Sequence, residues 1–262
     1  MLRNIKELEA YSIGATDGVI GRVRDFYFDD DRWAIRYLVV ETSDRAPRHK
    51  VLISPIGIGQ ADRSLKILPV AVTRYQVDHS PAIDTDKPVS RQHEMGYLGY
   101  YGYGNYWGGG GLWGAGIYPD ILQAGLEENG SARGHHDAHA DEARSANASQ
   151  TGSVRQDPHL RSVNAFMRYY VHAADGDVGH VEGLLMDDKS WAIRYIIVNT
   201  SNWWMGHRVI LAPQWIDHLS WAESELYVDL TRQAIKDSPP YDGAATLDDE
   251  QAAAIDAHYG RG

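Results

Sequence analysis

The feature that most constrains the fold is a five-residue string that occurs twice. The string Trp-Ala-Ile-Arg-Tyr occupies residues 33–37 and again residues 191–195, a separation of 158 positions (191 − 33). Other matches keep this separation without a gap, so that Ser80-Pro81 recurs as Ser238-Pro239. An ungapped match of this extent indicates a duplicated unit whose two copies fold alike.

The duplication divides the 262 residues into four parts. We expect two repeats, at residues 1–81 and 159–241, each large enough for a small core. Residues 82–158 are expected to form a low-complexity linker. Residues 242–262 are expected to form an acidic tail with a short helix, because Thr246 is a suitable N-cap and acidic residues follow it.

Each repeat reads as a set of short strands. In the first, residues 23–28 and 33–40 are rich in β-branched and aromatic residues, and the polar residues 29–32 between them predict a hairpin. Two further strand-like runs follow, and Thr73 is a suitable N-cap for one helical turn. The prediction is a mainly β protein with two small antiparallel β-barrels in tandem, each closing with a short helix.

The linker contains two unusual segments. Residues 96–118 are dense in glycine and aromatic residues, which suits either a flexible tether or a segment whose rings dock on a barrel or on another chain. His135, His136 and His139 could hold a metal if that stretch were helical, but no packed scaffold is evident there. A solvated linker is favoured, and no metal or cofactor is predicted.

Candidate interaction residues lie in and around the repeated string. Trp33 and Trp191 begin its two copies, and each tryptophan is expected to share a strand face with the tyrosine of its string, while the arginine lies on the other. Arg36 and Arg194 stand between apolar neighbours. In one interpretation, each arginine lies at a barrel end, where it snorkels to solvent or pairs with a turn aspartate. In the other, it anchors an acidic partner or the other barrel.

One pair of histidines and one pair of tryptophans complete the candidates. His49 and His207 match each other, and neither has an evident serine or carboxylate partner. Trp203 and Trp204 have no aromatic counterpart in the first repeat. An exposed tryptophan pair in a loop would mark an interface, because tryptophan is enriched at binding hot spots.

Composition argues against several functions. The net charge of −11 provides no basic footprint for nucleic acid, and the absence of cysteine excludes disulfides and thiolate catalysis. The neighbouring carboxylates of Asp29-Asp30 and Asp187-Asp188 point apart and do not form an acid–base pair, so no enzyme activity is predicted. The charged N-terminus and the absence of a spanning segment lead us to expect a cytoplasmic protein, or one peripheral to a membrane complex.

The repeats resemble the PRC-barrel family, found in the H subunit of the photosynthetic reaction centre and in a ribosome-maturation factor. The resemblance rests on the Gly-x-Val strand at Gly21, the Asp-rich turn, the strand from Arg36, the basic-Val strand ending in proline, and the closing residues 226–241. It covers both repeats, but not the linker or the tail. It implies a barrel of about six strands that works through contact with partners.

These expectations lead to one function and three alternatives. We expect a non-catalytic protein–protein interaction or scaffold module, with two barrels packed as a pseudo-symmetric pair and an unknown protein partner or a second copy of the chain. The alternatives are a peripheral membrane-complex or photosynthesis-associated subunit like the reaction-centre H subunit, a ribosome- or RNA-associated factor, and an uncharacterised enzyme. The chain lacks the membrane-spanning helix of the H subunit and the N-terminal domain of the ribosome factor, so neither specific role is carried over.

Overall fold

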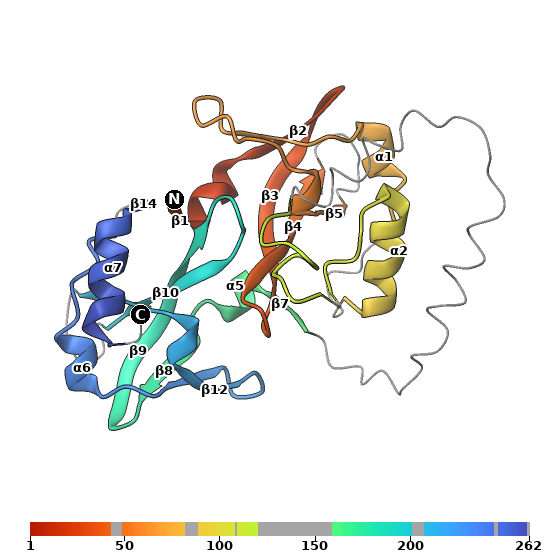
Figure 1. Ribbon diagram of the computed structural model, residues 1–262. Helices are drawn as coiled ribbons and strands as arrows, with labels where there is room; N and C mark the ends of the chain where they lie inside the picture. Colours follow the sequence, from red (N-terminus) through yellow and green to blue (C-terminus); the bar gives the residue numbers. More distant parts are fainter. Residues whose placement is uncertain are drawn as a thin grey trace.

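The structure is a computed structural model that describes residues 1–42, 49–81, 89–107, 109–119, 159–200, 207–243 and 246–260. It is mainly β, with two mixed sheets. In Figure 1 the long strands of both halves cross the centre of the molecule, with α1 and α2 at one end and α6 and α7 at the other.

The first half contains one long hairpin with shorter elements around it. Thr73 caps α1, accepting the Gln76 N–H while the Gln76 side chain accepts from the Thr73 N–H, as expected from the sequence. The elements are β1 (Leu2–Asn4), η1 (Ile5–Ala10), β2 (Ser12–Ala15), β3 (Gly18–Asp29), β4 (Ala34–Thr42), β5 (Lys50–Ile53), η2 (Pro55–Gly57), β6 (Ile67–Pro69), α1 (Arg74–Asp78) and α2 (Arg91–Tyr101).

The second half repeats this order at the same separation along the chain, except that α5 stands in place of η1 and that β12 and β14 are additional strands. Its strand β12 corresponds to two isolated bridges of the first half, Ile58 with Val70 and Asp62 with Ile67. The elements are β7 (Leu160–Ser162), α5 (Val163–Phe166), β8 (Tyr170–Ala173), β9 (Gly176–Asp187), β10 (Ile193–Asn199), β11 (Arg208–Leu211), η3 (Pro213–Trp215), β12 (Ile216–Ser220), β13 (Glu225–Val228), α6 (Arg232–Lys236), β14 (Thr246–Leu247) and α7 (Asp249–His258).

The matched unit extends beyond residues 1–81 and 159–241. Helix α2 lies in the expected linker and helix α7 in the tail, and they occupy equivalent positions. Their N-caps are also equivalent: Ser90 accepts from the N–H of His93, and Asp248 accepts from that of Gln251. The caps differ in residue type, so the correspondence is visible in the structure and not in the letters.

Each sheet is mixed and not wholly antiparallel. The strand orders are β5-β4-β3-β2-β6 and β11-β10-β9-β8-β13-β12. The β2–β6 and β8–β13 pairs are parallel, and the other neighbours in these orders are antiparallel. Within the described residues neither order returns to its first strand, so no closed barrel is present in that part of the chain.

The two halves exchange a strand with each other. Strand β1 of the first half pairs with β9 of the second, with Leu2 opposite Asp187. Strand β7 of the second half pairs with β3 of the first, with Leu160 opposite Asp29. The two pairings are equivalent, because adding 158 to Leu2 and Asp29 gives Leu160 and Asp187. The exchange joins the halves through backbone hydrogen bonds as well as through the chain itself.

The repeated string lies where the halves meet. Ala34 bridges Ala192, and these are equivalent residues, so the pseudo-two-fold axis passes between them. The Ile35 N–H donates to the Trp191 carbonyl (2.9 Å), and the Ile193 N–H donates to the Trp33 carbonyl (2.7 Å). The string therefore makes the junction between the halves.

Both tryptophans of the string lie in the turn before the strand, not on a strand face as expected. Trp33 has φ 50° and Trp191 has φ 59°, a left-handed conformation that is uncommon for a bulky residue. The pairing of β3 with β4 shifts register just after this turn: Phe28 is opposite Ile35, but the preceding Tyr27 is opposite Tyr37. Arg36 is the additional residue of this β-bulge, so simple alternation fails here.

No helix in the described part of the chain is long and apolar enough to cross a bilayer.

The glycines of the Gly-x-Val strands provide a test of the duplication. A Cβ at Gly21 would lie 1.9 Å from the Glu41 carbonyl oxygen, and one at Gly179 would lie 1.9 Å from that of Asn199. We expect Gly21→Ala and Gly179→Ala each to lower the free energy of unfolding by about 2 kcal/mol, because the backbone must shift. Denaturant unfolding measures this loss.

The matched control is Gly96→Ala in α2, where an added Cβ meets nothing within 4 Å. It should raise the free energy of unfolding by up to about 1 kcal/mol, because alanine is the better helix former. Unchanged midpoints in both strand variants would contradict the close approach described here.

Candidate functional site

Arg36 is buried beneath the glycine- and aromatic-rich segment. Its Nη2 lies 3.0 Å from Asp29 Oδ2, and its Nη1 donates to the Leu112 carbonyl at 2.7 Å. The guanidinium carbon lies 4.1 Å from the centre of the Tyr106 ring and 4.7 Å from that of Trp113. Burial lowers the pKa of Arg36, and Asp29 opposes that shift. This arginine has a structural role and is covered from solvent.

Helix α2 contributes a second buried charge beside this segment. Glu94 accepts a hydrogen bond from the Tyr106 hydroxyl, lies 2.8 Å from His159 Nε2, and lies 3.4 Å from Arg91 Nη1. Burial and the neighbouring Glu94 raise the pKa of Tyr106 well above its usual value. The carboxylate thus connects α2, the aromatic segment and the start of the second half.

The described part of residues 96–118 is packed against both halves. Tyr97, Tyr106 and Trp113 are buried in the core. The Trp113 Nε1 donates to the Ser190 carbonyl of the second half at 2.7 Å. Of the two interpretations of this segment, docking of its rings describes these residues, and the flexible tether does not.

The pseudo-two-fold creates two equivalent positions beside the junction, and rings fill one of them. Phe28, Trp33, Phe166 and Trp221 pack there with centroids 5.5 to 6.2 Å apart. Arg161 lies over Trp221 at 4.3 Å and donates from Nε to Asp30 at 2.8 Å. Both halves therefore contribute rings to this cluster. Beside it, Arg161 of the second half is paired with Asp30 of the first.

The other equivalent position is open. Smaller or more flexible residues replace the rings: Met186 for Phe28, Leu8 for Phe166 and Arg63 for Trp221. A cavity of about 690 Å³ lies there, within the usual range for small-molecule sites. Its lining is Arg3, Leu8, Ile58, Gly59, Gln60, Ala61, Arg63, Leu68, Tyr118, Pro119, Met186, Asp188, Lys189 and Trp191.

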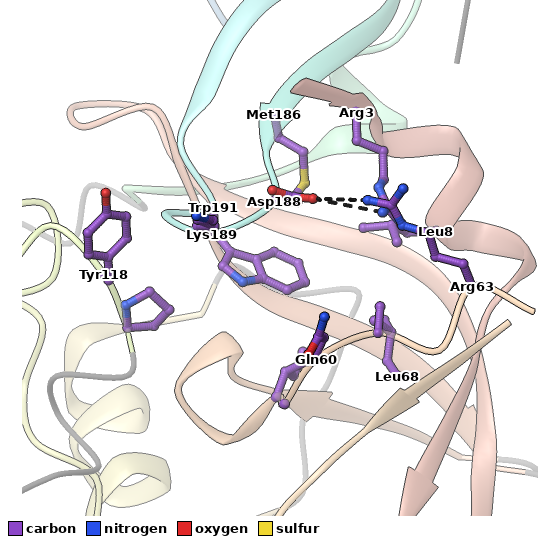
Figure 2. Close-up of a pocket in the computed structure, with 14 residues that line it drawn as sticks. Arg3, Leu8, Gln60, Arg63, Leu68, Tyr118, Met186, Asp188, Lys189 and Trp191 are labelled. Carbon is purple, nitrogen blue, oxygen red and sulfur yellow. Dashed lines mark hydrogen bonds and ion pairs between the residues drawn. The ribbon is translucent and has the colours of Figure 1, made fainter. Parts of the chain in front are cut away.

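The charges of the cavity are unequal. Arg3, Arg63 and Lys189 line it, against the single carboxylate of Asp188. Asp188 Oδ2 lies 3.5 Å from Arg63 Nη2 and 3.9 Å from Arg3 Nη2. Figure 2 shows both arginines beside Asp188 at one end of the cavity, with the Trp191 indole between them and Tyr118. The site combines a cationic end with an apolar wall.

The structure separates the residues singled out from the sequence. Trp191 lines the cavity, whereas its equivalent Trp33 packs in the ring cluster. Arg36 pairs with a turn aspartate, one of the two interpretations offered for it. Arg194 is exposed and lines a smaller cavity of about 320 Å³ with Tyr195 and Asp256.

The backbones of the matched histidines His49 and His207 hydrogen-bond to the end of the neighbouring strand. The His49 carbonyl accepts from the Thr42 backbone N–H at 3.0 Å, and the His207 carbonyl accepts from that of Thr200 at 3.2 Å. Trp203 and Trp204 lie outside the described residues, as does the cluster of His135, His136 and His139. No interface or metal site is assigned to them.

Most cavity residues were not singled out from the sequence. Arg3, Leu8, Arg63 and Met186 are ordinary surface or core residues when each is considered alone. The signal lies in the differences between the repeats, where a large aromatic residue in one copy corresponds to a smaller or charged residue at the equivalent position of the other. Such a comparison needs the exchange of β1 and β7, because residues from both halves form each position.

No protein-family model and no curated protein matches this chain.

The two arginines of the repeated string should differ sharply in their effect on stability. Arg36→Ala removes the partner of buried Asp29 and should lower the free energy of unfolding by about 3 kcal/mol or more. Arg194→Ala, the same change at the exposed equivalent position, should alter it by about 0.5 kcal/mol or less. Equal losses in the two variants would show that Arg36 is not the covered residue described here.

Buried tyrosines predict a loss of stability at alkaline pH. Burial is the main cause that raises the pKa values of Tyr37, Tyr97 and Tyr106 well above 10. The unfolded chain loses these protons near pH 10 while the fold keeps them, so stability is complete below pH 10 and falls as pH rises above it. Each tyrosine should cost up to about 1.4 kcal/mol per pH unit above 10.

Denaturant unfolding between pH 8.5 and 11.5 measures this dependence. Tyr37→Phe keeps the ring and removes one ionisable group, so its slope above pH 10 should be shallower than that of the wild-type chain. A Tyr37→Phe slope identical to wild type would count against a buried, protonated Tyr37.

Proposed function

We propose that this chain is a non-catalytic interaction or scaffold module built from two PRC-barrel-like repeats, which holds a partner at the cavity between its halves. The observation that carries the proposal is the position of that cavity beside the pseudo-two-fold junction. Arg3 and Leu8 come from the first half, and Met186 and Trp191 come from the second. Tyr118 belongs to the glycine- and aromatic-rich residues 96–118, called the connecting segment below. The site exists only when the three are packed together.

The fixed relation of the halves supports this function. The reciprocal pairings of β1 with β9 and of β7 with β3 hold both sides of the cavity in register. The Trp113 hydrogen bond to Ser190 ties the connecting segment to the turn that carries Trp191. A site held on paired strands is preorganised, which lowers the entropy lost on binding.

The chemistry of the lining favours binding over catalysis. The described residues that form the cavity include one carboxylate and no histidine, serine or threonine. The other ionisable groups of the lining are basic side chains and Tyr118, and Asp188 already pairs with Arg63 and Arg3. This lining therefore presents no unpaired carboxylate as a general base. The acidic turn of Asp29 and Asp30 lies in the other equivalent position, where those carboxylates pair with Arg36 and Arg161.

Filling the cavity tests the proposal in the full chain. Ala61→Leu with Met186→Phe installs the side-chain types of Leu219 and Phe28, which the other position carries. A thermal-shift screen of neutral, anionic and cationic small molecules and short peptides should reveal ligands that stabilise wild type. A ligand at 100 times its Kd should add about 2.7 kcal/mol to stability, and this gain should vanish in the filled variant.

The matched control is Ala253→Leu with Met95→Phe, the same chemical changes at exposed positions of α7 and α2. Ligand stabilisation should persist in this control, and the ligand should be recovered unaltered after incubation. Equal stabilisation of wild type and the filled variant would place binding elsewhere, and consumption of the ligand would indicate an enzyme.

A further inference from the structure

The divergence of the two equivalent positions defines the chemistry of the open one. In the filled position, Trp221 covers the Arg161 guanidinium at 4.3 Å, and Asp30 accepts from its Nε at 2.8 Å. In the open position, Arg63 stands in place of Trp221 and Lys189 in place of Asp31. The carboxylate of Asp30 is thus retained as Asp188, whereas the aromatic cover and the exposed Asp31 are replaced by two cations.

Arg3 is the buried charge of the open position. It is only 4% exposed, and its Nε has no hydrogen-bond partner within the described residues. Its nearest carboxylate, Asp188, lies 3.9 Å from Nη2 and is also contacted by Arg63. The Arg3 Nη1 donates to the Tyr11 hydroxyl at 3.4 Å. Among the residues that the structure describes, the positive charge of Arg3 is therefore balanced only by a carboxylate that it shares with Arg63, and a second anion beside this pair would be favoured.

Apolar side chains line much of the rest of the cavity. The Trp191 indole lies between the arginine pair and Tyr118 in Figure 2, and Leu8, Ile58 and Leu68 also line the space. The equivalent volume in the other position is occupied by aromatic rings. A ligand with an aromatic body would therefore make contacts here of the kind that Phe166 and Trp221 make there.

We propose that the open position binds a small organic anion in which a carboxylate is joined to an aromatic body. The carboxylate accepts from Arg3 and Arg63 and offsets part of the excess positive charge, and the ring lies along Trp191. Arginine suits this task because its planar fork matches a carboxylate. This inference rests on the proposed function and specifies the ligand class of the same cavity.

Isothermal titration with two probes tests the charge requirement in the full chain. The probes are naphthalene-1-acetate and the neutral, nearly isosteric naphthalene-1-acetamide. Wild type should bind the carboxylate about tenfold or more tightly than the amide, because hydrogen bonds to charged groups are the stronger ones. This preference should shrink as ionic strength rises, because Arg63 is accessible to screening ions.

Two variants locate the preference. Arg63→Met should weaken carboxylate binding about tenfold and leave amide binding unchanged. Arg22→Met makes the same change of net charge at an exposed position of β3 outside the cavity, and it should alter neither affinity. Arg63 is 58% exposed, so its replacement leaves the fold intact, as circular dichroism would verify.

The possible outcomes test the organic-anion assignment separately from the proposed function. Equal affinities for the two probes in wild type, no binding of either, or an Arg63→Met variant with undiminished carboxylate binding would overturn the organic-anion assignment. None of these results decides the proposed function. That function is tested only by the thermal-shift comparison, in which the filled variant should lose the ligand stabilisation seen in wild type. A carboxylate preference lost in Arg63→Met and kept in Arg22→Met supports the assignment.

Discussion

The backbone hydrogen bonds across the pseudo-two-fold axis are the interaction on which the rest of the structure depends. Trp33 and Trp191 adopt a left-handed conformation, and their carbonyls accept from Ile193 and Ile35 of the opposite half. Strands β1 and β7 then cross to the other half and extend its sheet. Without this junction neither equivalent position beside it would have its full set of walls.

Two kinds of electrostatic environment result from one symmetric framework. Arg36 is enclosed by the connecting segment and paired with Asp29, whereas Arg194 remains exposed. Arg161 has a carboxylate at 2.8 Å and lies over the Trp221 ring, whereas the carboxylate beside Arg3 lies 3.9 Å away and is shared with Arg63. In both cases the backbone positions are equivalent, and the difference arises from the side chains and the connecting segment placed around them.

The sequence predicts the repeated elements well because their signals are local. The turn at Asp29, the strands around it and the cap at Thr73 each follow from neighbouring residues. The exchange of β1 and β7 is not predictable in this way, because three-residue strands carry little pattern and pair with distant partners. The bulge at Arg36 also broke the expected alternation, and the cavity emerges only when equivalent residues of the two halves are compared in space.

The covalent link between the halves has a consequence for how the two positions can change. In a homodimer of identical chains, any substitution appears at both symmetric positions, so ring packing and an open cavity could not coexist there. Here Trp221 and Arg63 are encoded separately. One position can remain packed with rings while the other lacks that packing and has the exposed Arg63 beside its cavity. Within one chain, two positions related by a pseudo-two-fold axis can therefore differ in both packing and charge.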